Sequence, residues 1–126
     1  MAATPPDAGW RRFTAAAFWV ALLAAFIMAV LPQPPELPGR PSDKLLHLAA
    51  FAILTALATL AYPRLHPVRL LLGLSAFGAL IELVQAVPTL RRDSDWVDWV
   101  ADTCAILAVQ AATLSFRGWE LPGQAR

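Results

Sequence analysis

Cysteine and charge are scarce in this sequence. The chain of 126 residues contains a single cysteine, Cys104, which lies inside an apolar run. One cysteine excludes an internal disulfide and a site built from several thiolates, so a packing role is predicted for it. Charged residues make up only 15% of the chain, and its net charge is +1. No basic face of the kind that binds nucleic acid is expected, which removes nucleic acid as a partner.

Apolar residues, by contrast, are abundant. They make up 58% of the chain, and the mean hydropathy of +0.55 is far above that of soluble domains. Four runs have the length of about 20 residues that a helix needs to cross a hydrocarbon core about 30 Å thick. They are residues 13–31, 44–62, 68–87 and 97–116. Because lipid offers backbone groups no hydrogen bonds, each run is predicted to be a helix, and the prolines between the runs are expected to end the helices.

The predicted fold is all-α: a polytopic membrane protein with four transmembrane helices in an antiparallel bundle, whose first partner is the lipid bilayer. The bundle occupies residues 13–116, between an N-terminal segment of residues 1–12 and a tail of residues 117–126. The first run could instead be a secretory signal. It is longer than the usual apolar stretch of about 7 to 15 residues, and the proline-rich LPQPPELPG follows it in place of a cleavage site, so a retained anchor is predicted.

Lysine and arginine indicate the orientation, because short cytoplasmic loops carry an excess of both. With the N-terminus in the cytoplasm, six of these ten residues lie inside and four outside. Three of the outer four lie among carboxylates, and a structural or chemical role there would explain why they are outside despite this tendency. Both termini are therefore predicted to be cytoplasmic, with residues 34–40 and 89–94 outside.

Most polar residues of the predicted helices fall at one face of the membrane. In an antiparallel bundle, the start of the second helix, the end of the third and the start of the fourth lie together. Residues three or four positions apart share a helix face, so each helix presents one polar stripe to the others. A charge inside a membrane helix costs roughly 2.5 to 3.5 kcal/mol on insertion scales, so these side chains should face inward and find partners. The polar site predicted at the outer mouth of the bundle consists of Asp43, Lys44, His47, Glu82, Gln85, Arg92, Asp95, Asp98 and Asp102.

The same residues carry a resemblance to a known family. The segments SDKLLHLAAF, IELVQ and RRDSDWVDWVADT resemble the VanZ-like family of small bacterial membrane proteins, whose founding member belongs to a teicoplanin resistance cluster. The resemblance covers residues 42–105, about half of the chain. It implies a cell-envelope protein of the bacterial cytoplasmic (inner) membrane, related to antibiotic resistance through that founding member. The family's polar residues fall on Asp43, Lys44, His47, Glu82, Gln85, Arg92 and Asp98.

Two positions depart from the family's pattern. This chain has Asp102 where the family usually has Asn, which adds a carboxylate and can change the charge state of the site. It has Ala105 where the family usually has Gly, which allows the helices to approach less closely.

Three interpretations of the polar site remain open. In the structural one, acids cap helix N-termini and charges pair to fix helix register, Glu82 with Arg92 and His47 with Asp102. In the second, the cationic side chains bind the phosphate of an envelope lipid or of a peptidoglycan precursor. In the third, the crowded carboxylates support acid/base catalysis, or bind Mg²⁺ or Zn²⁺, for hydrolysis or transfer. No H-E-x-x-H motif is present, so the sequence itself names no cofactor or metal.

Overall fold

A computed structural model describes residues 7–32, 38–39 and 42–120. The regular secondary structure of these residues is entirely helical. It consists of α1 (Ala8–Val30), α2 (Asp43–Ala61), α3 (Pro67–Gln85), the short 3-10 helix η1 (Pro88–Leu90) and α4 (Trp96–Glu120). All four α-helices are long and apolar enough to cross a membrane. The chain is therefore a multi-pass membrane protein with the predicted all-α fold of four helices.

Capping residues set where the helices begin. The carboxylate of Asp7 accepts a hydrogen bond from the backbone N–H of Trp10 (2.8 Å), so α1 begins at Ala8 and not at the predicted residue 13. The hydroxyl of Ser42 accepts from the N–H of Leu45 (3.2 Å) at the start of α2. Such acceptors stabilise a helix start because the first N–H groups have no partner within the helix.

The other boundaries lie close to the predicted ones, except at the end of α4. This helix continues to Glu120, past the predicted end at residue 116. Three predicted segments lie partly outside the described residues: residues 1–6 of the N-terminal segment, residues 34–37 and 40 of the segment 34–40 that is predicted to lie outside, and residues 121–126 of the tail.

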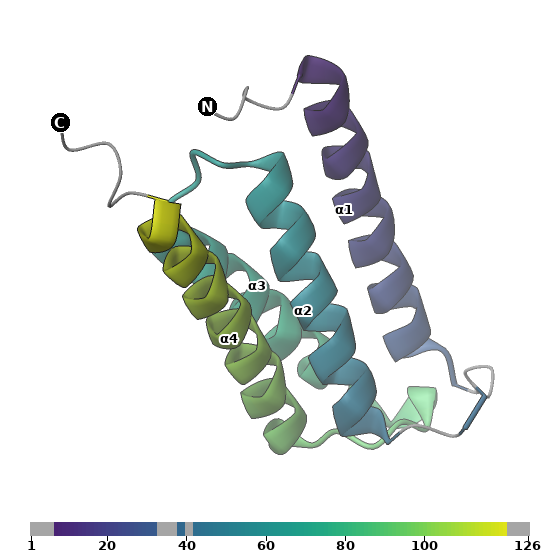
Figure 1. Ribbon diagram of the computed structural model, residues 1–126. Coiled ribbons are helices and arrows are strands. Elements are labelled where there is room, and N and C mark those ends of the chain that lie inside the picture. Colours follow the sequence, from purple (N-terminus) through teal and green to yellow (C-terminus); the bar gives the residue numbers. More distant parts are fainter. Residues whose placement is uncertain (1–6, 33–37, 40–41, 121–126) are drawn as a thin grey trace, which may run out of the picture.

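Successive α-helices run in opposite directions (Figure 1). The helix α2 packs along both α1 and α4, and α3 packs along α4, whereas α2 and α3 contact each other little. The order of neighbours around the bundle is therefore α1, α2, α4, α3. As a consequence, the main interface joins α2 to α4, two helices that are distant in the sequence.

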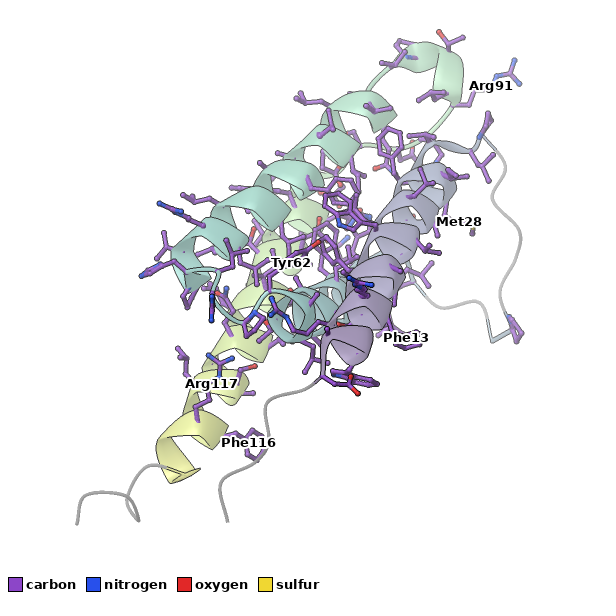
Figure 2. The ribbon with its side chains drawn as sticks, turned by 90° about the horizontal axis from the view of Figure 1, so that it is seen from above. Phe13, Met28, Tyr62, Arg91, Phe116 and Arg117 are labelled. Atoms are coloured by element: carbon purple, nitrogen blue, oxygen red, sulfur yellow. The ribbon has the colours of Figure 1, made fainter. Side chains whose placement is uncertain are left out.

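A small apolar core fills the centre of the bundle. Phe51 of α2, Ile81 of α3 and Ile106 of α4 are almost completely buried there. The outside is apolar as well: Phe13 and Phe116 are exposed and point away from the other helices (Figure 2). Helices that are apolar on all sides are typical of membrane spans, whose outer faces meet lipid chains.

Cys104 corrects one prediction from the sequence. Its neighbours two positions away on α4, Asp102 and Ile106, are fully buried. The helical period turns a residue by about half a revolution over two positions, which carries the thiol to the outer surface. Cys104 is accordingly exposed, and its predicted packing role is wrong.

Candidate functional site

Buried polar side chains gather at one end of the bundle. At this end, named the polar end, α2 begins, α3 ends and α4 begins (lower end in Figure 1). Of the six polar side chains that are buried among the described residues, four lie here. They are Glu82 (8% exposed), Gln85 (2%), Asp98 (5%) and Asp102 (0%). The polar end is therefore the end of the bundle at which the sequence predicts the polar residues to gather, and Glu82, Asp98 and Asp102 face inward there.

His47 and Asp102 join α2 to α4. The distance between His47 Nδ1 and Asp102 Oδ1 is 2.7 Å, and with the carboxylate ionised the ring donates this hydrogen bond. The imidazole also stacks on Phe51, with 5° between the ring planes. These contacts turn the Nε2 atom toward Asp98, whose Oδ2 is 4.0 Å away. The predicted pairing of His47 with Asp102 is confirmed.

Glu82 binds the loop before α4. Its Oε2 atom accepts hydrogen bonds from the backbone N–H of Asp95 (2.9 Å) and from the hydroxyl of Ser94 (3.2 Å). The same hydroxyl also contacts the backbone oxygen of Glu82 (3.0 Å). Glu82 therefore ties the end of α3 to the start of α4 through polar groups of the chain that carry no charge.

The predicted pairing of Glu82 with Arg92 is wrong. Arg92 donates from Nη1 to the backbone oxygen of Leu31 (3.2 Å), the residue that ends α1. The last carbonyl groups of a helix have no partner within the helix, so they attract such a donor. Gln85 also binds the end of α1, because its amide donates a hydrogen bond to the backbone oxygen of Ala29 (3.0 Å). Arg92 and Gln85 thus hold α1 against the polar end.

Lys44 lies on the outer side of the cluster. Its ammonium group is 3.1 Å from Asp95 Oδ2 and 3.4 Å from Asp98 Oδ1, and the side chain is 51% exposed. Asp95 also caps α4, since its Oδ1 accepts from the backbone N–H of Val97 (3.0 Å). The Val97 N–H and then the Lys44 ammonium hold the pKa of the Asp95 carboxyl below its ordinary value.

Asp43 stays apart from the buried cluster. It is exposed in the first turn of α2. A negative charge at this position is favourable because the N-terminal end of a helix carries partial positive charge. The structural interpretation therefore accounts for Asp43.

The sequence analysis missed the role of Gly78. A Cβ atom placed on this glycine of α3 would lie 2.8 Å from Asp102 Oδ2 and 3.4 Å from Phe51 and Trp99. The missing side chain thus makes room for the carboxylate of Asp102. Helical spacing held the signal, because Gly78, Glu82 and Gln85 are separated by four and three positions and share one face of α3.

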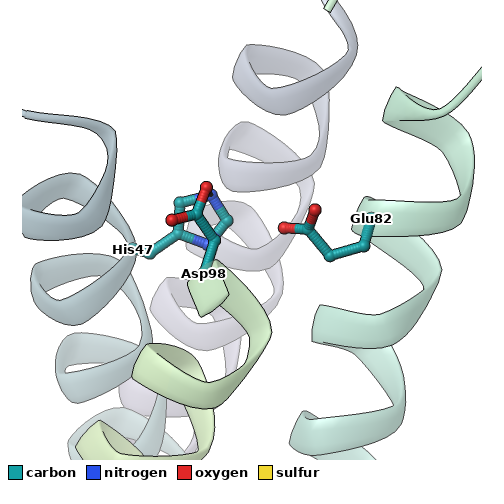
Figure 3. Close-up of side chains that lie close together, drawn as sticks. All are labelled: His47, Glu82 and Asp98. Carbon is teal, nitrogen blue, oxygen red and sulfur yellow. Dashed lines mark ion pairs between the residues drawn. The ribbon is translucent and has the colours of Figure 1, made fainter. Parts of the chain in front are cut away.

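The contacts within the described residues leave several buried acceptors without a hydrogen bond. They are Glu82 Oε1, Gln85 Oε1, Asp98 Oδ1 and Asp102 Oδ2. Figure 3 shows His47, Glu82 and Asp98 projecting from three different helices, with the Glu82 carboxylate directed at the other two. An unsatisfied buried acceptor is costly, so a group of them indicates a ligand or a proton that completes the site.

Comparisons of the chain with protein-family models, with curated proteins and with solved structures find no match.

Proposed function

We propose that this protein is a VanZ-like protein of the bacterial cytoplasmic membrane that binds a phosphorylated envelope lipid, or a peptidoglycan precursor, at its polar end. The observation that supports this proposal is an exposed arginine beside an open depression. The depression is lined by Leu31, Pro32, Thr89 and Arg91, between the end of α1 and η1. The planar guanidinium group offers paired donors that match the oxygens of a phosphate.

The backbone at Arg91 supports a specific role for its side chain. Its φ of 50° lies in the left-handed region, which costs a residue with a Cβ atom roughly 1 to 2 kcal/mol. This turn directs the side chain away from the helices (Figure 2). Strained positions of this kind are concentrated at functional sites. No carboxylate of the described residues lies within salt-bridge distance of Arg91.

The rim of the polar end at Arg91 and its buried acceptors suit different parts of such a ligand. A phosphate would be repelled by the buried carboxylates, so it belongs on the rim at Arg91. The lipid chain would lie along the apolar surface near Leu31 and Pro32. The buried acceptors, among them Gln85 Oε1, would accept hydrogen bonds from the hydroxyl or amine groups of a sugar or peptide headgroup.

Lipid binding can be tested with the full chain in a mild detergent. Native mass spectrometry would measure the affinity for a polyprenyl phosphate, with phosphatidylglycerol as the general anionic lipid. The variant Arg91→Asn keeps a residue that tolerates the left-handed backbone but removes the charge, and affinity should fall roughly 10-fold or more. The control Arg64→Asn removes an exposed arginine at the opposite end and should bind as the wild type does. Equal affinity for both lipids, or equal loss in both variants, would contradict the proposal.

A second candidate function is hydrolysis or transfer on an envelope lipid, by acid/base or metal-dependent chemistry. The observation in its favour is the orientation of His47, whose Nδ1 is held by Asp102 while Nε2 faces Asp98. A histidine oriented by a carboxylate is a common arrangement for a general base. Release of phosphate from a polyprenyl diphosphate would be the assay, and His47→Gln should lower the rate roughly 100-fold or more. Failure of the wild type to release phosphate would leave lipid binding as the function.

A further inference from the structure

Three potential metal ligands meet inside the polar end. One ligand atom each of His47, Glu82 and Asp98 lies within 4.8 Å of the other two, and they come from α2, α3 and α4 (Figure 3). Two ligands of a tetrahedral cation with bonds of about 2.0 to 2.2 Å lie roughly 3.4 Å apart. The three atoms must therefore approach one another by up to about 1.4 Å to coordinate a common cation, a distance that rotation of the side chains can supply.

The orientation of His47 is the one that metal binding requires. Its Nδ1 atom is occupied by Asp102, so Nε2 is the nitrogen that can coordinate, and it faces Asp98. Histidine ligands commonly give their second nitrogen to a carboxylate, which fixes the ring and makes the coordinating nitrogen more basic. Asp102 would thus act as a positioning residue behind the ligand His47.

The carboxylates have the capacity to coordinate. Glu82 and Asp98 are both more than nine-tenths buried, and each keeps one oxygen without a hydrogen bond to a described residue, Oε1 and Oδ1 respectively. The Oδ2 atom of Asp98 is the one that faces His47. Asp98 Oδ1 lies 3.4 Å from the half-exposed Lys44 ammonium, whereas Glu82 Oε1 is a buried acceptor with no such contact, which is unfavourable without a ligand.

The charge balance also favours a cation. Glu82, Asp98 and Asp102 are three buried carboxylates, and the cationic side chains that contact them are His47, when protonated, and Lys44. Lys44 is half exposed and shared with Asp95, so it compensates the buried charge incompletely. A divalent cation between His47, Glu82 and Asp98 would supply the missing positive charge.

We infer that His47, Glu82 and Asp98 bind one divalent transition-metal cation per chain, such as Zn²⁺ or Mn²⁺. An imidazole nitrogen combined with carboxylate oxygens suits these ions, whereas Mg²⁺ and Ca²⁺ prefer ligand sets made of oxygen alone. Three protein ligands leave at least one position open for water or for a ligand group. The inference does not depend on lipid binding, because it rests on the contacts of the three side chains.

Metal binding can be measured on the full-length protein without an affinity tag, after removal of metals with a chelator. Co²⁺ serves as the spectroscopic probe, and Zn²⁺ is then titrated to displace it. The wild type should bind one Co²⁺ with visible absorption bands, and Zn²⁺ should abolish them. Absence of stoichiometric binding by the wild type would overturn the inference without the need for any variant.

Variants locate the site. Glu82→Gln and Asp98→Asn should each weaken Co²⁺ binding at least roughly 10-fold, and His47→Gln should do the same. The control Asp93→Asn removes an exposed acid of the loop before α4, and this variant should bind Co²⁺ as the wild type does. The control His66→Gln removes the other histidine of the chain, which lies in the loop between α2 and α3. Loss of the absorption bands in His66→Gln, or their retention in His47→Gln, would show adventitious binding and overturn the assignment.

Discussion

The imidazole of His47 and the carboxylate of Asp102 meet at 2.7 Å across the interface of α2 and α4. The contact joins the two helices that share the largest interface of the bundle. It is also shielded, because Asp102 is completely buried. In such surroundings a hydrogen bond between two polar groups fixes the depth at which each helix sits relative to the other. Asp102 is therefore the residue of α4 that holds the imidazole of His47 in place.

The first prediction separates the shape of the Asp102 side chain from its charge. Asp102→Ala leaves His47 without its partner and should lower the free energy of unfolding by about 1 to 3 kcal/mol. Asp102→Asn keeps an oxygen that accepts from Nδ1–H and should stay within about 0.5 kcal/mol of the wild type. Chemical unfolding in detergent would measure both. An Asn variant as unstable as the Ala variant would show that the negative charge itself is needed.

The second prediction concerns the partner of Glu82. A double-mutant cycle of Glu82→Ala with Ser94→Ala should give a coupling of about 1 kcal/mol in the free energy of unfolding, because the two side chains share a hydrogen bond. The cycle of Glu82→Ala with Arg92→Ala should give less than about 0.5 kcal/mol. A larger coupling with Arg92 would restore the ion pair that the sequence suggested.

Helical periodicity explains why part of the site could be predicted. His47 and Asp102 lie on two parallel helices, α2 and α4, at similar depth from the polar end, so spacing and hydropathy together place them opposite each other. Glu82 is different, because its partners lie in the loop before α4. The left-handed turn at Arg91 and the backbone N–H of Asp95 decide that contact. Neither a loop conformation nor a backbone donor has a periodic signal in the sequence.

The order of the helices around the bundle could not be predicted from the sequence either. Hydropathy and proline positions identify four spans and their alternating directions, which is enough to bring the polar residues to one end. They do not specify that α2 lies beside α4 and not beside α3. That choice depends on the packing of individual side chains, one example of which is the close approach of α3 to Asp102 of α4 that Gly78 allows.

The third prediction uses the pH dependence of the exposed pair of Lys44 and Asp95. The folded state lowers the pKa of Asp95, so the ionised carboxyl stabilises the fold. This contribution is present above the unfolded pKa of about 3.9 and is lost as the pH falls through the folded value. Asp95→Asn should therefore lower the melting temperature at pH 6, and this effect should become smaller as the pH falls below about 3.9. The control Asp93→Asn, in the same loop, should change the melting temperature at pH 6 by less than Asp95→Asn does.

The fourth prediction is the orientation in the membrane. Cysteines introduced one at a time into a Cys104→Ala background would report which loops are outside. Thr89→Cys, near the polar end, should react with an impermeant thiol reagent in spheroplasts, because the charge distribution places this loop outside. Leu65→Cys, at the opposite end, should react only after permeabilisation. The reverse pattern would place both termini outside and the polar end in the cytoplasm.

The fifth prediction compares two glycines of α3. Gly78→Ala would place a methyl group 2.8 Å from Asp102 Oδ2, so either the carboxylate or α4 must shift. Overpacking of this kind should lower the free energy of unfolding by about 1 to 3 kcal/mol. Gly73→Ala adds the same group where no heavy atom lies within 4 Å, and the helix propensity of alanine should leave stability equal or raise it by up to about 1 kcal/mol. Unfolding of both variants in detergent would provide the comparison. Equal stability of the two would mean that Asp102 moves without cost, in which case Gly78 does not fix the carboxylate that orients His47.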